Sequence, residues 1–146
     1  MHKRAPKRKG VYERKGTYGI DEVLSKVPDM DIGSISSRMK REHTIVFDGV
    51  LVSMVSDRYL CFKKSGTTCV TCGLKGTFFA LERTRKSGKG NNPHGRYHFN
   101  LYGYDADGDE VMLTKDHIVP RSEDGKDHVD NYQTMCKMCN EREGNK

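Results

Sequence analysis

The stretch LTKDHIVPRSEDGKDHVDNYQTMCKMCNEREGNK, residues 113–146, decides the fold. It begins as an apolar strand, continues through a polar loop to Asn131, and ends in the short strand YQTM and the helical segment KMCNERE. Upstream, YHFNLYGY and EVMLTKDHIV flank DADGD and predict a hairpin. DADGD resembles the start of a calcium loop, but no glutamate stands at the twelfth position, so a turn is expected. Hairpins and short helices of this kind predict an α+β fold.

Four of the five cysteines form two CxxC pairs, Cys69-x-x-Cys72 and Cys136-x-x-Cys139. Zinc prefers a tetrahedron of thiolates, and a two-residue spacer lets both sulfurs of a pair face one ion. Hydrophobic residues make up only 34% of the 146 residues and tryptophan is absent, so a lean core benefits from such a staple. We therefore expect one structural zinc that joins two pairs 63 residues apart. The remaining Cys61 is expected to be a buried small hydrophobe.

The N-terminal part of the chain predicts an arm followed by short elements. Residues 1–16 carry seven Lys or Arg and little to bury, which predicts a disordered basic arm, either lying along phosphates or acting as a solubilising tail. IDEVLSKV and SISSRMKRE predict two short helices, the second capped by Ser34. We expect them to pack on the core, with a DNA-docking unit as the alternative.

Further along, turn and cap residues mark the remaining elements. TIVF and VLVSMV flank Asp48-Gly49 and predict a hairpin, and SDRYLCFKK predicts a helix capped by Ser56 and closed by Gly66. TFFALE predicts a strand, and the Gly/Asn/Pro-rich residues 86–96 predict a loop. These elements divide the chain into the arm, a helical and hairpin part over residues 17–66 that could contact a nucleic acid, and a core over residues 67–146.

Charge and hydropathy indicate the setting and the class of partner. The net charge of +6 and the pI of about 9.1 favour a polyanionic partner. The N-terminus lacks the apolar stretch of a secretory signal, and no segment approaches the roughly 20 apolar residues of a membrane span. A reducing, cytoplasmic setting without a membrane partner is therefore expected, where paired CxxC motifs hold metal more often than they form disulfides.

The polar residues of the C-terminal stretch fit the needs of phosphodiester hydrolysis. This reaction requires a base to activate water and a cation to stabilise the developing charge. Asp116-His117 ends an apolar strand, and Asn140 directly follows the last cysteine. A neutral imidazole suits the base, while carboxylate and amide oxygens suit magnesium. A helix pinned by zinc would hold Asn140 opposite the strand that bears Asp116.

At these residues the sequence resembles the HNH (His-Me finger) endonuclease family. The resemblance covers about the C-terminal half of the chain in family order. It is carried by Cys69-x-x-Cys72, Asp116-His117-Ile118-Val119-Pro120, Gly125, Asp127, Asn131 and Cys136-x-x-Cys139-Asn140. It implies a zinc-stapled ββα-metal core and a nuclease that nicks DNA with a catalytic Mg²⁺ or Mn²⁺.

The resemblance also implies a role for each matching residue. Asp116 would be a ligand of the catalytic cation, and His117 would be the general base. Asn131 would orient the loop and hold the imidazole of His117 in place. Asn140 would be the second cation ligand. Glu143, three residues further on, either reaches the cation or its water, or is a solvated helix residue.

Departures from the family pattern keep alternatives open. Many relatives carry histidine at the position of Asn140 and lysine three residues later. Asn140 with Glu143 is more similar to phage junction-resolving endonucleases. This similarity favours a branched-DNA substrate and a phage protein. The end of the chain at Lys146 argues against a resolvase. A third alternative is a zinc-stapled binding module without catalysis, against which the presence of every site residue argues. Monomer and dimer, and cleavage of RNA, stay open.

Overall fold

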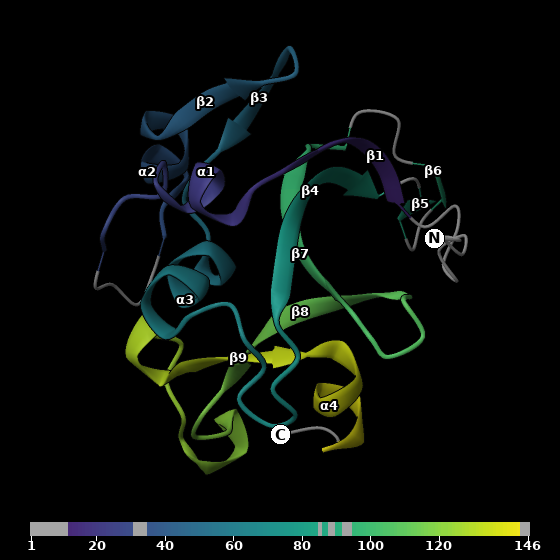
Figure 1. Ribbon diagram of the computed structural model, residues 1–146. Coiled ribbons are helices and arrows are strands. Elements are labelled where there is room, and N and C mark those ends of the chain that lie inside the picture. The colour runs from purple at the N-terminus through teal and green to yellow at the C-terminus, as the bar shows by residue number, and fades with distance from the viewer. Residues whose placement is uncertain (1–11, 31–34, 85, 88–89, 92–94, 144–146) are drawn as a thin grey trace.

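The computed structural model describes residues 12–30, 35–84, 86–87, 90–91 and 95–143 (Figure 1). In chain order its helices and strands are β1 (Tyr12–Tyr18), α1 (Ile20–Leu24), α2 (Ser37–Glu42), β2 (Thr44–Phe47), β3 (Val50–Ser53), α3 (Asp57–Ser65), β4 (Gly76–Thr84), β5 (Lys86–Ser87), β6 (Gly90–Asn91), β7 (His98–Tyr104), β8 (Glu110–His117), β9 (Tyr132–Cys136) and α4 (Lys137–Arg142). Two 3-10 turns, Arg121–Glu123 and Val129–Asn131, lie between β8 and β9. The expected α+β class is confirmed.

Five antiparallel strands form the main sheet, in the order β1-β4-β7-β8-β9. Successive side chains of a strand point to opposite faces of the sheet, and side chains on each face of β8 contact a different helix. Lys115 lies 3.9 Å from the carboxylate of Asp57 on α3, whereas its neighbour Thr114 accepts a hydrogen bond from Asn140 on α4. The two helices therefore cover opposite faces of the β8–β9 end of the sheet, as Figure 1 shows.

The hydrophobic core lies between the sheet and the helices α1 and α3. Alternate residues of β4 and β7 point into it and are fully buried, among them Phe79, Leu81 and Phe99. The ring of Phe99 makes edge contacts with Phe47 and Phe79. Cys61 on α3 is buried in the same cluster, and burial raises the pKa of its thiol to about 11, which confirms that it behaves as a small hydrophobe.

The main correction concerns the expected basic arm. Residues 12–16 belong to β1, which pairs with β4, and the rest of the arm lies outside the described residues. Arg14 donates to the buried carboxylate of Glu82 at 2.7 Å and to Glu110 at 2.7 Å. Its guanidinium also lies over the ring of Tyr102. These contacts give Arg14 partners within the sheet. The sequence alone suggested a solvated arm, because Glu82 and Glu110 lie far from Arg14 along the chain.

The smaller elements agree with the sequence apart from two boundaries. The β2–β3 hairpin turns at Asp48-Gly49, Ser56 caps α3, and DADGD is the turn between β7 and β8. The helix α2 begins at Ser37 with Ser36 as its cap, and Ser34, the expected cap, lies outside the described residues. Part of the expected loop 86–96 pairs as the short hairpin β5–β6. Among the described residues no helix is long and apolar enough to cross a membrane.

Candidate functional site

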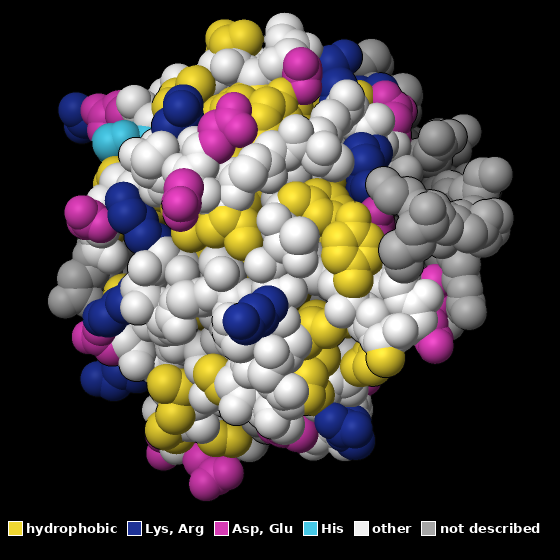
Figure 2. Space-filling model, viewed as in Figure 1, with side chains coloured by type: hydrophobic (Ala, Val, Ile, Leu, Met, Phe, Trp, Pro, Cys, Tyr) yellow, Lys and Arg dark blue, Asp and Glu magenta, His cyan; other side chains and the backbone are white. Residues whose placement is uncertain are grey.

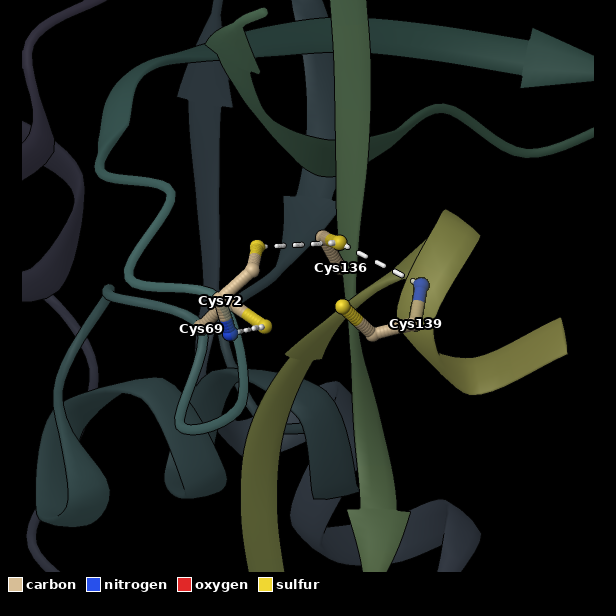
Figure 3. Close-up of side chains that lie close together, drawn as sticks. All are labelled: Cys69, Cys72, Cys136 and Cys139. Atoms are coloured by element: carbon tan, nitrogen blue, oxygen red, sulfur yellow. Dashed lines mark hydrogen bonds between the residues drawn. The ribbon is translucent and has the colours of Figure 1, made fainter. Parts of the chain in front are cut away.

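Four cysteine side chains converge beside α4. Cys69 and Cys72 lie in the turn before β4, Cys136 ends β9 and caps α4, and Cys139 lies within α4. Their sulfur atoms all lie within 4.8 Å of one another, and Cys72 and Cys136 are 3.8 Å apart (Figure 3). Four sulfurs placed about 2.3 Å from a tetrahedral zinc are themselves separated by about 3.8 Å. This four-cysteine cluster therefore has the donor atoms and the spacing of a structural zinc site.

Backbone geometry prepares each pair to bind a cation. The amide of Cys72 donates to the sulfur of Cys69 at 3.5 Å, and the amide of Cys139 donates to Cys136 at 3.4 Å. Gly73 follows the first pair with a φ of +81°, a conformation that residues with a Cβ rarely adopt. The two halves of the site thus share the same amide-to-sulfur hydrogen bond, although one lies in a turn and the other at the start of a helix.

The electrostatics of the cluster favour a bound cation. Burial opposes ionisation of Cys69, but backbone N–H groups outweigh it and lower the pKa of this thiol to about 6. Burial raises the pKa of Cys136 to about 12, and burial likewise raises the pKa of Cys139. Thiolates this close together oppose one another's ionisation, because like charges repel. A bound dication would stabilise all four thiolates, which is the chemistry of a structural zinc centre.

A hydrogen-bonded histidine stands at the end of β8. The Nε2 atom of His117 lies 2.7 Å from Oδ1 of Asp127, and Arg121 donates to the same oxygen at 3.0 Å. The hydrogen bonds from His117 and Arg121 lower the pKa of Asp127, which keeps it a carboxylate. A carboxylate can only accept, so Nε2 carries the proton of the neutral ring and Nδ1 is left as its basic nitrogen. The ring of Tyr132 holds the imidazole from the side, edge to face.

Asn131 holds the loop that follows His117. Its side-chain oxygen accepts from the amide of Val119 at 2.9 Å, and its amide donates to the carbonyls of Val119 and Lys126 at 3.0 and 2.9 Å. Gly125 packs so closely against this loop that a Cβ there would lie 1.7 Å from the carbonyl oxygen of Val119. Asn131 therefore bonds to loop backbone, while the imidazole of His117 is bonded to Asp127.

The two expected cation ligands share one face of β8. Asp116 is buried at 8% exposure, and Gln133, directly opposite on β9, donates to its Oδ2 at 3.2 Å. Asn140 on α4 donates to Thr114, which lies two residues before Asp116 and hence on the same face. A buried carboxylate and an amide on one face form the oxygen-rich donor set that Mg²⁺ or Mn²⁺ prefers.

Glu143 lies toward the first cysteine pair. At the C-terminal end of α4 its carboxylate accepts a hydrogen bond from the hydroxyl of Thr71 at 3.3 Å. Thr71 lies between Cys69 and Cys72, so this contact joins α4 to the first cysteine pair. The expected reach of Glu143 toward the catalytic cation stays a prediction.

The structure also brings in residues that the sequence reading did not single out. Gln133 and Thr114 are hydrogen bonded to Asp116 and Asn140, as described above, and the ring of Tyr132 contacts His117. The feature that could have identified Tyr132 and Gln133 is the strand register, because His117 pairs with Tyr132 and Asp116 pairs with Gln133. This register becomes readable only once β8 and β9 are known to be neighbours.

Along the C-terminal segment, Asp116 and His117 end β8, and the second cysteine pair holds the helix α4. Residues 104–146 match the HNH endonuclease family. The resemblance seen in the sequence is confirmed over this HNH segment, which contains β8, β9 and α4. The first cysteine pair lies outside the matched residues, and the fold brings it to the HNH segment. No curated protein and no solved structure matches the chain.

Proposed function

We propose that the chain is a metal-dependent endonuclease that hydrolyses DNA phosphodiester bonds and nicks one strand per active site. The observation that carries this proposal is the pairing of His117 with Asp127 at the end of β8, directly after Asp116, which shares one face of that strand with Asn140. We interpret β8, β9 and α4 as a ββα-metal core, with the four-cysteine cluster as its structural zinc site.

The proposed reaction uses the basic nitrogen of the imidazole. His117 accepts a proton at Nδ1 from a water molecule as the oxygen of that water bonds to phosphorus. The bond from phosphorus to the leaving oxygen breaks, and this oxygen takes up a proton from solvent. A divalent cation bound by Asp116 and Asn140 would supply charge stabilisation for the phosphate. Asp127 stabilises the positive charge that His117 gains, and Asn131 keeps the loop between them in place.

The first test is relaxation of a supercoiled plasmid by zinc-loaded protein with added Mg²⁺ or Mn²⁺. We expect conversion of supercoiled to open-circular DNA that depends on the added metal and stops with EDTA. If linear, supercoiled and branched DNA all stay intact with both metals, while zinc is bound stoichiometrically, the protein is a binding module and the proposal is wrong. Strong preference for branched DNA by a stable dimer would favour the resolvase alternative.

The setting and the source belong to this proposal as well. Cysteines must stay reduced to hold zinc, so a zinc site formed by the four-cysteine cluster supports a cytoplasmic setting. A phage origin rests only on the resemblance of the Asn140 and Glu143 spacing to phage enzymes.

The positive charge that would attract DNA is concentrated at the N-terminus. Residues 1–16 contain seven of the 26 Lys and Arg but one of the 20 Asp and Glu, which leaves 19 of each sign in the rest of the chain. In the view of Figure 2, Lys and Arg alternate with Asp and Glu, and no continuous basic surface is seen among the described residues of that face. Arg14 is already paired with Glu82 and Glu110, so we infer that the five Lys and Arg of residues 1–11 supply most of the electrostatic attraction to phosphates.

Deleting residues 1–11 should weaken DNA binding and its dependence on salt, while β1 stays intact. The deletion removes five Lys and Arg, and each lost phosphate contact lowers the slope of log K against log salt by about 0.9. The measurement is a salt titration of DNA affinity, with a matched variant in which the five basic residues are replaced by serine. An unchanged slope in both variants would identify the segment as a solubilising tail.

A further inference from the structure

A threonine hydroxyl lies between the metal-binding face of β8 and the helix α4. The hydroxyl of Thr114 donates to the backbone carbonyl of Met135 at 2.9 Å and accepts from Nδ2 of Asn140 at 3.1 Å. Thr114 lies on the same face of β8 as Asp116, because the two are separated by one residue of a strand. Asn140 is therefore hydrogen bonded to a hydroxyl that lies on the same face of β8 as the proposed cation ligand Asp116.

The direction of these two hydrogen bonds determines how the amide of Asn140 is turned. A hydroxyl has one proton, and the carbonyl oxygen of Met135 can only accept, so the proton of Thr114 is committed to Met135. Toward Asn140 the hydroxyl can then act only as an acceptor. Asn140 must present its NH2 group to Thr114, which turns its carbonyl oxygen away from the hydroxyl.

This orientation matters because the two ends of an amide have opposite abilities toward a cation. The carbonyl oxygen is a ligand for Mg²⁺ or Mn²⁺, whereas the NH2 group only donates hydrogen bonds. An amide without a fixed partner exchanges the two ends by a half-turn about its last side-chain bond. A half-turned Asn140 would direct its NH2 group at the cation, and binding would have to reverse it first.

We propose that Thr114 is a positioning residue, which selects the orientation of Asn140 that binds the catalytic cation. The inference rests on the proposed function, since it takes Asn140 as a cation ligand. Groups that orient a metal ligand without touching the metal typically change metal affinity about 10- to 100-fold when they are replaced. We expect an effect of this size for Thr114. It acts through its hydrogen bond to Asn140 on α4, a helix that carries Cys139 and is capped by Cys136.

The test replaces Thr114 by valine, which has nearly the same shape but no hydroxyl, and by serine, which keeps it. Binding of Mn²⁺ to zinc-loaded protein is followed by the loss of the free-ion EPR signal, without DNA. We expect Thr114→Val to bind Mn²⁺ about 10- to 100-fold more weakly and Thr114→Ser to bind nearly as the unaltered protein does. The Mn²⁺ concentration for half-maximal nicking should rise by a similar factor, with less change in the rate at saturating Mn²⁺.

Controls separate this inference from the proposed function and from a loss of folding. Thr77→Val, at an exposed position on β4, should leave Mn²⁺ binding unchanged, and all variants should keep their zinc and melting temperature. If Asn140→Ala weakens Mn²⁺ binding but Thr114→Val does not, Thr114 has no positioning role. If Asn140→Ala and Asp116→Ala both bind Mn²⁺ normally, the proposed cation site is wrong, and the inference about Thr114 is overturned with it.

Discussion

Replacing His117 by alanine should abolish plasmid nicking while the protein stays folded and keeps its zinc. A positioned general base typically contributes about 10²- to 10⁴-fold to a rate, so residual nicking should fall below about 1%. The fold should survive, because β8 and β9 are joined by backbone pairing at this position and the imidazole contributes only its contacts to Asp127 and Tyr132. The rate of supercoiled DNA loss at saturating Mn²⁺ measures the effect.

His43→Ala is the matched control for this experiment. His43 follows α2 and His117 ends β8, and these two elements lie in different parts of the fold (Figure 1). We expect it to cleave at the unaltered rate, since the same change is made away from the candidate site. Normal cleavage by His117→Ala would exclude His117 as the base and leave the family match without its expected chemistry.

Loss of the zinc centre should unfold much of the HNH segment. Cys136 is 1% exposed, and serine at this position cannot replace a thiolate ligand. Structural zinc contributes roughly 10–16 kcal/mol in small zinc-finger peptides, as much as the whole stability of a typical domain, which is about 5–15 kcal/mol. We therefore expect Cys136→Ser, or prolonged chelation, to reduce bound zinc from one ion per chain and to remove the cooperative melting transition.

Zinc content by mass spectrometry and melting by circular dichroism would measure this effect. Cys61→Ala is the control, because Cys61 is a buried thiol on α3 outside the cluster. It should keep one zinc per chain, even if the melting temperature falls slightly from the change in the core. A Cys136→Ser protein that melts like the unaltered one would show that the four cysteines do not staple the fold.

The parts of the fold that were predictable from the sequence are those specified by neighbouring residues. The β2–β3 hairpin needed only Asp48-Gly49 between two apolar runs, and the Ser56 cap needed only its own helix. The two cysteine pairs were predictable because zinc allows few spacings, and the structure brings them together.

What could not be predicted depends on contacts between distant segments. β1 looked like part of a charged arm because Glu82, which binds Arg14, is 68 residues away. The roles of Thr114 and Gln133 depend on the register of β8 against β9, and a shift of one residue would leave these two side chains on opposite faces of the sheet. The pairing of His117 with Asp127 depends on the path of the loop between them, which Asn131 sets by binding its backbone.

The wide separation of the two cysteine pairs along the chain has a consequence for synthesis. A ribosome makes the first cysteine pair long before the second, since 63 residues separate Cys72 from Cys136. A nascent chain therefore carries two thiols that cannot complete a tetrahedron, and α4 has nothing to anchor it. Translation interrupted before Cys136 yields a chain that lacks Asn140 as well. If the chain is the zinc-dependent nuclease proposed above, this order makes it active only after both pairs have been made and the cell has supplied zinc.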